Sequence, residues 1–553
     1  MVAISPAIRL AVSRIRPFSR QITLAVAFPF IWMLVSSTRR DDLASSFPFS
    51  GSTHYKPVPI PGPKIPVTIV NDTLGGLAVC LDGSPPGFHF QAGTGDGASK
   101  WVIFLEGGAW CDSIQDCHNR SLTKLGSSNQ MQPYKFIGIL SPDPEINPEF
   151  FSWNRVVVRY CDGASFSGNK NSPIKVPGQN STFIFFRGSH IMPAVVNHLL
   201  QHHNLRAASH VLFGGGSAGA LAAFLHCDWF AKTMLQESQP VTSPSDAAAA
   251  AANGAASGAA AASSPSPSSS LSSPSSSFSP PVVKCMGDGG IFLDTKDVGG
   301  QHEMRKLFSA VVRLQNVSVH QGCLEHLKSQ TAERWKCFFP EYFLPLLHTP
   351  LFIGNTLYDS WQMNYSFAVP ASFQSKDWDQ CRWSLADCPW NLLRKFHTYR
   401  AEMVKKLQPL MQARVSASVP SLRQAGQEPG LEQAGQEPGS GSRGLKGWIQ
   451  GGEGVRGGKE ALSGEQGGLG SVKRCPHGFF LASCHMHTMA LWASWHGLQG
   501  PLLSDQSMAQ AVADWFFERK EVRLVDEIFG RNPSCPSSSQ RRQSKAKQRS
   551  NAG

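Results

Sequence analysis

A segment near the middle of the chain places a serine between a buried strand and a helix, and few folds accommodate that arrangement. The apolar run Val211–Phe213 is typical of a buried strand, and residues 221–226 are typical of the first turns of a helix. Between them lies Gly215-Gly216-Ser217-Ala218-Gly219, the Gly-x-Ser-x-Gly pattern of a sharp strand-to-helix turn, whose crowded backbone requires small residues. Such a turn exposes the Ser217 hydroxyl and directs the N–H of Ala218 toward the place where an oxyanion would form. The alternative is a glycine-rich connection whose serine has no chemical role. The rest of the sequence has to decide between the two.

The remaining sequence alternates short apolar runs with helical patterns. Strand-like runs occupy residues 102–105, 155–160, 211–213 and 351–354, and helical patterns occupy residues 190–203, 219–232 and 303–315. This alternation predicts an α/β fold with a mostly parallel sheet flanked by helices. A hydrophobic content of 41% is enough to build one large core.

Two low-complexity tracts interrupt this alternation. Residues 237–281 are rich in Ala, Ser and Pro, and residues 415–473 are rich in Gly, Gln and Glu. Both tracts are predicted to be disordered insertions, because they have little apolar surface to bury. Since both fall between strand and helix patterns, we expect a single catalytic domain over residues 60–500 into which two loops have been inserted.

The net charge of +12 originates at the two ends of the chain. Residues 1–40 carry six Arg and no acid, and residues 531–553 carry six Lys or Arg and no acid. The rest of the chain has 39 basic and 39 acidic side chains, so it is formally neutral. A basic groove for nucleic acid is therefore not expected, and residues 531–553 are predicted to be a disordered, solvated tail.

Residues 1–40 are predicted to direct the chain into the secretory route. Their apolar run 22–35 would reach roughly 21 Å as a helix, short of a hydrocarbon core of about 30 Å, which favours a signal peptide. A signal-anchor stays open because the leader is long, and the Arg-rich, acid-free start also fits a transit peptide. We expect no stable membrane association unless this segment is retained.

Thirteen cysteines and five glycosylation sequons support the same route, because disulfides form in oxidising compartments. The sequons begin at Asn71, Asn119, Asn180, Asn316 and Asn364. The odd number of cysteines implies at least one thiol that is free or paired between chains. A zinc site would have to use Cys484, His485 and His487, and no pair of Cys-x-x-Cys motifs exists, so no metal is expected.

A glycine-rich loop offers a second partner for an oxyanion. Gly107 and Gly108 directly follow the first strand-like run, where glycines let the backbone approach a ligand closely. A tight turn is the alternative for this loop taken alone. Its position about 110 residues before Ser217 favours an oxyanion hole formed by Gly107, Gly108 and Ala218.

A reactive serine also needs a base, and a histidine base needs an acid to orient it. Asp359 follows the strand-like run 351–354, and His485 and His487 follow an apolar run near the end of the chain. This order of serine, acid and histidine is the one found in α/β-hydrolases. Asp288 and Asp294 are rival acids or substrate contacts.

Further motifs accompany these residues in order along the chain. They are Phe104–Cys111, Trp153–Arg155, Val158–Phe166, Gly216–Gly219, His226–Asp228, Phe292–Asp294, Cys337–Pro340 and Tyr358–Gln362. In these motifs the chain resembles the plant-type pectin acetylesterases and, more distantly, the Notum carboxylesterases that share their fold. The resemblance covers residues 65–235, 282–400 and 475–497.

This resemblance implies an α/β-hydrolase-like fold and a secreted serine esterase that acts in the cell wall, with a membrane-anchored form as the alternative. It implies Ser217 as nucleophile, Asp359 as orienting acid and His487, rather than His485, as base. The implied substrate is an acetyl ester on pectin or another acylated polysaccharide, and no cofactor is required. The oligomeric state is not indicated.

Four positions depart from the family pattern and two other functions stay open. Ala109 stands where the family has a third glycine in the oxyanion loop, and Ala220 where it has the last glycine of the elbow. Gly216 stands where the plant enzymes usually have a cysteine, and Thr488 where a cysteine usually follows the catalytic histidine. These changes leave the reacting groups in place but put the acyl pocket and local disulfides in doubt. The alternatives are a Notum-like lipid or protein deacylase and an inactive, secreted carbohydrate-binding relative.

Overall fold

A mostly parallel sheet organises the part of the chain that the computed structural model describes, residues 64–238, 279–327, 331–367, 376–413, 476–492, 494–497 and 500–535. The strand order in this sheet is β13-β12-β11-β10-β9-β4-β6-β3-β2. Neighbouring strands pair in parallel from β13 to β6, and β3 and β2 close one edge in antiparallel pairing. The strands are β2 (Thr68–Ile69), β3 (Gly87–Gln91), β4 (Lys100–Leu105), β6 (Asn154–Val158), β9 (His210–Gly216), β10 (Val282–Asp288), β11 (Leu351–Thr356), β12 (Gly478–Ala482) and β13 (Arg523–Val525).

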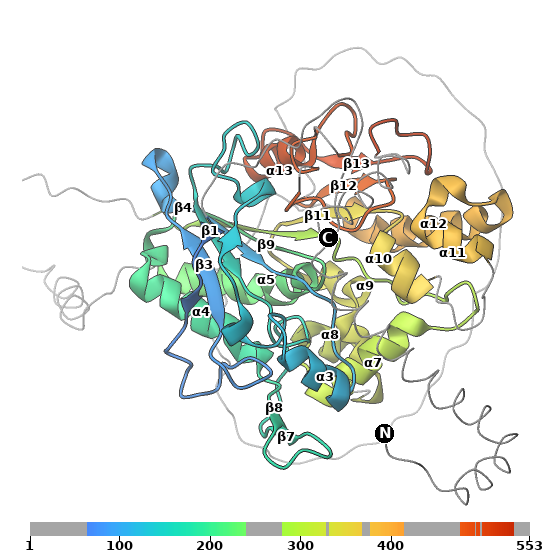
Figure 1. The fold of residues 1–553 in the computed structure, drawn as a ribbon. Helices are drawn as coiled ribbons and strands as arrows, with labels where there is room; N and C mark the ends of the chain where they lie inside the picture. The colour runs from blue at the N-terminus through green and yellow to red at the C-terminus, as the bar shows by residue number, and fades with distance from the viewer. Residues whose placement is uncertain are drawn as a thin grey trace, which may run out of the picture. The chain divides into compact units, whose positions relative to one another are not determined.

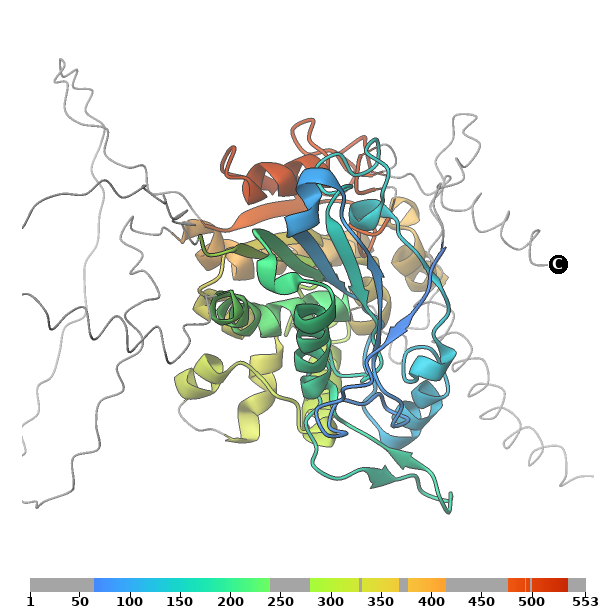
Figure 2. The same cartoon turned by 90° about the vertical axis from the view of Figure 1, so that its left-hand side faces the viewer.

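Helices cover both faces of this sheet, as Figures 1 and 2 show. In Figure 2 the red α13 lies on one side of the strands, and the green α4 and α5 lie on the other. The α-helices of four or more residues in the described part of the chain are α3 (Ile114–Ser121), α4 (Gly188–His202), α5 (Ala218–Glu237), α7 (Glu303–Gln315), α8 (Gln321–His326), α9 (Pro340–Phe343), α11 (Lys376–Trp383), α12 (Trp390–Gln412) and α13 (Met508–Phe516). Two separate antiparallel pairs, β1 (Lys64–Ile65) with β5 (Tyr134–Lys135) and β7 (Ile174–Lys175) with β8 (Phe183–Ile184), complete the strands.

Successive side chains of the central strands enter two different cores. On β4, Ile103 and Leu105 pack in the core that contains α4, α5 and α7, whereas Val102 and Phe104 pack in the core that contains α13. This distribution follows from the two-residue repeat of a strand. A strand buried on both faces reads as a continuous apolar run, which is why the central strands could be recognised in the sequence.

The predicted mostly parallel α/β fold is confirmed, and so are the predicted strands and helices named above. Strand β10 was not predicted, because Lys284 interrupts its apolar run. Lys284 is nevertheless buried, and its Nζ donates to the carbonyl oxygens of Trp515 and Phe516 at the end of α13. Burial lowers the pKa of the Lys284 ammonium, and the Glu518 carboxylate, whose Oε1 lies 2.9 Å from Nζ, acts to raise it.

The fold continues beyond the domain end that we expected near residue 500. Helix α13 and strand β13 follow that point, and β13 pairs with β12 in the main sheet. A disulfide joins Cys484 to Cys535, which lies inside the predicted basic tail 531–553. The boundary was misplaced because α13 and β13 complete the second core and one edge of the sheet.

Twelve cysteines form six disulfides in the described residues. The pairs are Cys80–Cys161, Cys111–Cys117, Cys227–Cys285, Cys323–Cys337, Cys381–Cys388 and Cys484–Cys535. The thirteenth cysteine, Cys475, lies outside the described residues. Because Cys484 forms a disulfide, it cannot supply the thiolate that a zinc site at Cys484, His485 and His487 would need.

Several expectations fall outside the described residues. These are the leader 1–40, nearly all of the tract 237–281, the tract 415–473 and the tail beyond Cys535. Among the helices that are described, none combines the length and the apolar character that crossing a membrane requires.

The Cys227–Cys285 disulfide predicts a large contribution to stability. It joins α5 to β10 across 58 residues, whereas Cys381–Cys388 spans 7. Because the chain-entropy effect grows with loop length, replacing both cysteines by Ala should lower the free energy of unfolding by about 4 kcal/mol for the first pair and about 2 kcal/mol for the second. Denaturant unfolding of the two double variants measures the difference, and equal losses would contradict the entropic explanation.

Candidate active site

Three side chains form a hydrogen-bonded chain at one edge of the sheet. Ser217 directly follows β9, Asp359 lies in the loop after β11, and His487 lies in the loop after β12. The Ser217 Oγ is 2.7 Å from His487 Nε2, and His487 Nδ1 is 2.8 and 3.0 Å from the two carboxylate oxygens of Asp359. All three separations are hydrogen-bond distances. The structure therefore brings together the three residues that the sequence predicted.

The backbone at Ser217 adopts a conformation that L-residues avoid. Its φ is 57° and its ψ is −126°, and it forms the N-cap of α5. The flanking glycines permit this turn, since a Cβ on Gly215 would lie 2.1 Å from the Gly219 carbonyl oxygen. The Ser217 N–H donates to the main-chain oxygen of Asp288 at 2.8 Å. Strain of this kind persists only where the surrounding structure fixes it.

The Asp359 carboxylate is fully buried but well provided with donors. Its Oδ1 accepts the N–H groups of Trp361 and Gln362, which begin the short helix α10 (Ser360–Gln362). A helix N-terminus favours a negative charge, and the remaining acceptor capacity faces His487. The Ser360 N–H also donates to the Met486 carbonyl oxygen at 3.0 Å, which ties the Asp359 loop to the His487 loop.

The predicted oxyanion residues lie beside Ser217. A Cβ on Gly107 would lie 2.8 Å from the Ser217 Cβ and 3.2 Å from the Ala218 nitrogen, so only glycine fits there. Ala218 is the first residue of α5, and its N–H therefore has no acceptor within the helix. Gly107 and Ala218 thus adjoin the same hydroxyl, and Gly108 follows in the same loop.

Two side chains hold the carbonyl groups of the Gly107–Ala109 loop. Arg120 donates to the Gly108 oxygen at 2.7 Å, and the Tyr160 hydroxyl donates to the Ala109 oxygen at 2.8 Å. Burial raises the pKa of Tyr160, so its hydroxyl stays a proton donor. Because the N–H and C=O of a trans peptide point in opposite directions, fixing these carbonyls also fixes the direction of the next N–H groups.

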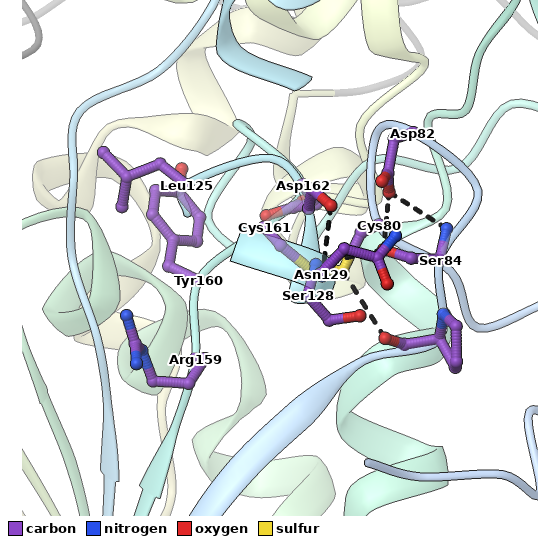
Figure 3. Close-up of a disulfide and its surroundings, with 12 residues drawn as sticks. Cys80, Asp82, Ser84, Leu125, Ser128, Asn129, Arg159, Tyr160, Cys161 and Asp162 are labelled. Atoms are coloured by element: carbon purple, nitrogen blue, oxygen red, sulfur yellow. Dashed lines mark hydrogen bonds between the residues drawn. A yellow bond between two sulfur atoms is a disulfide. The ribbon is translucent and has the colours of Figure 1, made fainter. Parts of the chain in front are cut away.

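The segment after β6 that carries Tyr160 is itself anchored. Arg159 forms an ion pair with Glu106 at 2.7 Å, and the Cys161 sulfur is bonded to Cys80. Figure 3 shows this disulfide with Tyr160 and Asp162 on the two sides of Cys161 along the chain. The buried Asp162 carboxylate accepts backbone N–H groups of the following loop. These supports could not be predicted from the sequence, because they depend on residues far apart in the chain.

The rival residues have other partners. Asp288 accepts backbone N–H groups of Met489 and Ala490 rather than the His487 ring. Asp294 is held by Arg305 in a bidentate ion pair with distances of 2.8 and 2.9 Å. His485 is buried two residues before the histidine that contacts Ser217.

Aromatic side chains surround His487, and their grouping could not be predicted because they come from segments far apart in the chain. The rings of Trp361 and Phe292 lie 6.1 and 6.4 Å from the His487 ring, and Trp110 packs edge-on against both. The Trp110 indole N–H donates to the Ser165 Oγ at 2.8 Å, so its polar atom is satisfied. Within the residues that the structure describes, no group of three or more His, Cys, Asp or Glu side chains is arranged to hold a metal ion.

Comparisons with known proteins bear on this site. The family model described as Pectinacetylesterase matches residues 61–262, 273–420 and 467–536. An Arabidopsis thaliana protein named pectin acetylesterase 5 is 32% identical over 462 residues, which cover 83% of this chain and 82% of the relative. Pectin acetylesterase 4 of the same plant is 30% identical, and the match covers 83% of this chain and 85% of the relative's length. The palmitoleoyl-protein carboxylesterase notum1 of Xenopus laevis is 27% identical, and the match covers 51% of this chain and 50% of the relative's length.

The strained backbone at Ser217 predicts that a glycine at this position gives a more stable protein than an alanine. Ser217→Gly relieves the strain of a positive φ, so it should be more stable than Ser217→Ala by about 1 kcal/mol after allowance for the greater unfolded-state entropy of glycine. Both variants lack the hydroxyl, and the alanine variant is therefore the matched control. Thermal and denaturant unfolding measure the difference, and a glycine variant no more stable than the alanine variant would refute it.

Proposed function

Because the chain belongs to the pectinacetylesterase family, we propose that it is a serine carboxylic-ester hydrolase that removes acetyl groups from cell-wall pectin. The observation that carries this proposal is the continuous hydrogen-bonded chain from Ser217 through His487 to Asp359. This geometry suits nucleophilic attack on an ester carbonyl, because the base lies within reach of the hydroxyl proton.

In the first half of the proposed reaction, His487 Nε2 takes the proton of Ser217 as its Oγ attacks the acetyl carbonyl carbon. Asp359 accepts from the Nδ1–H of His487, which holds the ring tautomer and stabilises the imidazolium. The negative charge that develops on the carbonyl oxygen is stabilised by the backbone N–H groups of Gly108 and Ala218, with Gly107 allowing the close approach. The bond between the carbonyl carbon and the sugar oxygen then breaks, and His487 gives its proton to that oxygen. The sugar leaves with a free hydroxyl, and an acetyl-serine remains.

In the second half, a water molecule attacks the acetyl-serine while His487 takes one of its protons. The tetrahedral intermediate collapses, the proton passes to Ser217 Oγ, and acetate leaves. His487 is 11% exposed and Asp359 is fully buried, so water can reach the base while the acid stays shielded. Nothing in these steps requires a cofactor or a metal.

We also propose that the protein is secreted to the cell wall. Six disulfides in the described residues support an oxidising compartment. Four of the five sequon asparagines are exposed, namely Asn71, Asn119, Asn180 and Asn316. Asn364 is buried, and its Nδ2 donates to the Ser360 carbonyl oxygen at 2.6 Å.

Removal of the Ser217 hydroxyl tests the catalytic proposal. Ser217→Ala should lower kcat for a short-chain aryl acetate by about 10⁴- to 10⁶-fold, because no covalent intermediate can form. Ser99→Ala is the control, since Ser99 precedes β4 and bonds Ser209 at the opposite edge of the sheet. It should retain wild-type activity. Equal rates for wild type and Ser217→Ala would reject the mechanism.

The substrate class needs a separate measurement. The wild-type protein should release acetate from acetylated pectin and should hydrolyse an aryl acetate faster than an aryl ester of a long fatty acid. A palmitoleoylated peptide is the comparator, because similarity to the Notum relative covers about half of each chain. Preference for the palmitoleoyl peptide, with Ser217→Ala inactive, would retain the mechanism and reject pectin as the substrate.

Glycan occupancy tests the proposed location. In protein secreted from plant cells, Asn71, Asn119 and Asn180 should carry N-linked glycans, because their side chains are exposed. Asn316 is exposed too, but its Nδ2 donates to the Asn169 carbonyl oxygen at 2.8 Å, so the test uses the other three. Asn364 should be unoccupied, since a glycan there would have to displace its hydrogen bond inside the fold. Peptide mass spectrometry after enzymatic deglycosylation measures each site. A glycan at Asn364, or none at the three exposed sites, would contradict this prediction.

A further inference from the structure

Asp288 contacts the loops of both Ser217 and His487 without touching either reacting atom. It ends β10, the strand between those that carry Ser217 and Asp359. Its main-chain oxygen accepts the Ser217 N–H at 2.8 Å. Its carboxylate Oδ2 accepts the N–H groups of Met489 and Ala490, each at 2.6 Å. One residue therefore links the backbone of Ser217 to the loop that carries His487.

The peptide that follows Asp288 is packed against the same loop. Gly289 has a φ of +67°, and a Cβ there would lie 2.6 Å from the His487 carbonyl oxygen. The Gly289 N–H donates to the Gly354 carbonyl oxygen of β11 at 2.8 Å. Only glycine satisfies both the conformation and the contact. The His487 backbone thus rests on the end of β10, and the Asp288 carboxylate holds it there.

The carboxyl group of Asp288 is electrostatically coupled to the site. It is fully buried, and burial raises its pKa to about 7, while the two backbone donors and His487 act to lower it and Asp359 acts to raise it. The strands on its two sides place the uncharged residues Gly216 and Gly354 next to it. Its Oδ1 has no hydrogen-bond partner among the described residues. His487 and Asp359 are accordingly the ionisable groups whose charge Asp288 senses.

We propose that Asp288 is a positioning residue that fixes the His487 loop to the turn that carries Ser217. The proposal rests on the roles proposed for Ser217, His487 and Asp359. No bond forms or breaks at Asp288. As the Ser217 proton moves to His487 Nε2, the ring keeps its place between Ser217 Oγ and Asp359, because Asp288 holds the backbone that follows His487.

Two consequences separate this role from a purely structural one. Because the Asp288 carboxyl group holds the loop of His487 and not the substrate, its loss should lower kcat with little change in KM, and a neutral side chain that keeps the acceptor should restore most of the activity. Stability should also depend on pH in a defined direction. Because the folded-state pKa of Asp288 is about 7, above its ordinary value of 3.8, its contribution to stability falls as pH rises from about 4 to about 7. A neutral side chain at this position removes that dependence.

The experiment compares Asp288→Asn, Asp288→Ala and Asp162→Asn in the full-length protein with an aryl acetate. Asp288→Asn keeps an oxygen that can accept from Met489 and Ala490 but removes the charge. Asp288→Ala removes both. Asp162→Asn is the matched control. The Asp162 carboxyl group is also fully buried, burial raises its pKa, and it accepts several backbone N–H groups. These donors come from the loop after β6 and not from the loop of His487.

Asp288→Ala should lower kcat by about 100-fold with little change in KM, the scale of effect that a displaced catalytic group produces. Asp288→Asn should recover activity to within about tenfold of wild type. Its melting temperature relative to wild type should rise between pH 4.5 and pH 8. Asp162→Asn should show a change of melting temperature in the same direction, because burial raises the pKa of Asp162 too.

Each result decides between the proposals. If Asp288→Ala retains wild-type kcat while Ser217→Ala is inactive, the positioning role is wrong and the catalytic proposal stands. If Asp288→Ala does not fold, Asp288→Asn decides alone, and a loss of kcat of about 100-fold in that folded variant overturns the proposal, because Asn keeps the acceptor for Met489 and Ala490. If Ser217→Ala is as active as wild type, the failure lies in the proposed mechanism and not in Asp288.

Discussion

The register of the parallel strands is the constraint on which the rest of this structure depends. Gly216 of β9 pairs with Asp288 of β10, and Asp288 pairs with Gly354 of β11. Since parallel strands end at the same edge of a sheet, the loops that follow β4, β9, β11 and β12 meet there. A slip of one residue would turn every side chain of a strand to the opposite core, so the apolar packing on both faces fixes this alignment. The site is therefore positioned by the core.

Backbone groups satisfy most of the buried charge that this edge requires. Asp359 accepts two N–H groups from the start of α10, and Asp288 accepts two from the loop after His487. Main-chain partners are held by secondary structure, so they stabilise a buried charge without ordering another flexible side chain. This explains how two carboxyl groups, those of Asp288 and Asp359, can be fully buried at this edge of the sheet.

The strained turn at Ser217 is held from several sides. Its N–H is bonded to Asp288, Gly107 packs against its Cβ, and α5 is buried among apolar side chains. Arg120 and Tyr160 hold the facing loop, and the Cys80–Cys161 disulfide anchors the segment that carries Tyr160. The Ser217 hydroxyl and the N–H groups proposed as oxyanion donors are thereby held in place before any substrate binds, which is the condition for effective electrostatic stabilisation.

The sequence by itself determined the central strands other than β10 and the helices around them, and it predicted Ser217, His487 and an acid in the order of a hydrolase, with Asp359 implied by the resemblance. Their signals are local: an apolar run buried on both faces, a Gly-x-Ser-x-Gly turn, and an acid and a histidine that follow strands in a known order. Only the tertiary structure supplied the contacts that distinguish Asp359 from Asp288 and Asp294, because each of the three follows a strand or loop of similar composition and differs in which atoms it faces. It also decided the place of Lys284 and the end of the fold at Cys535, because a buried lysine and a closing disulfide depend on partners more than 50 residues away.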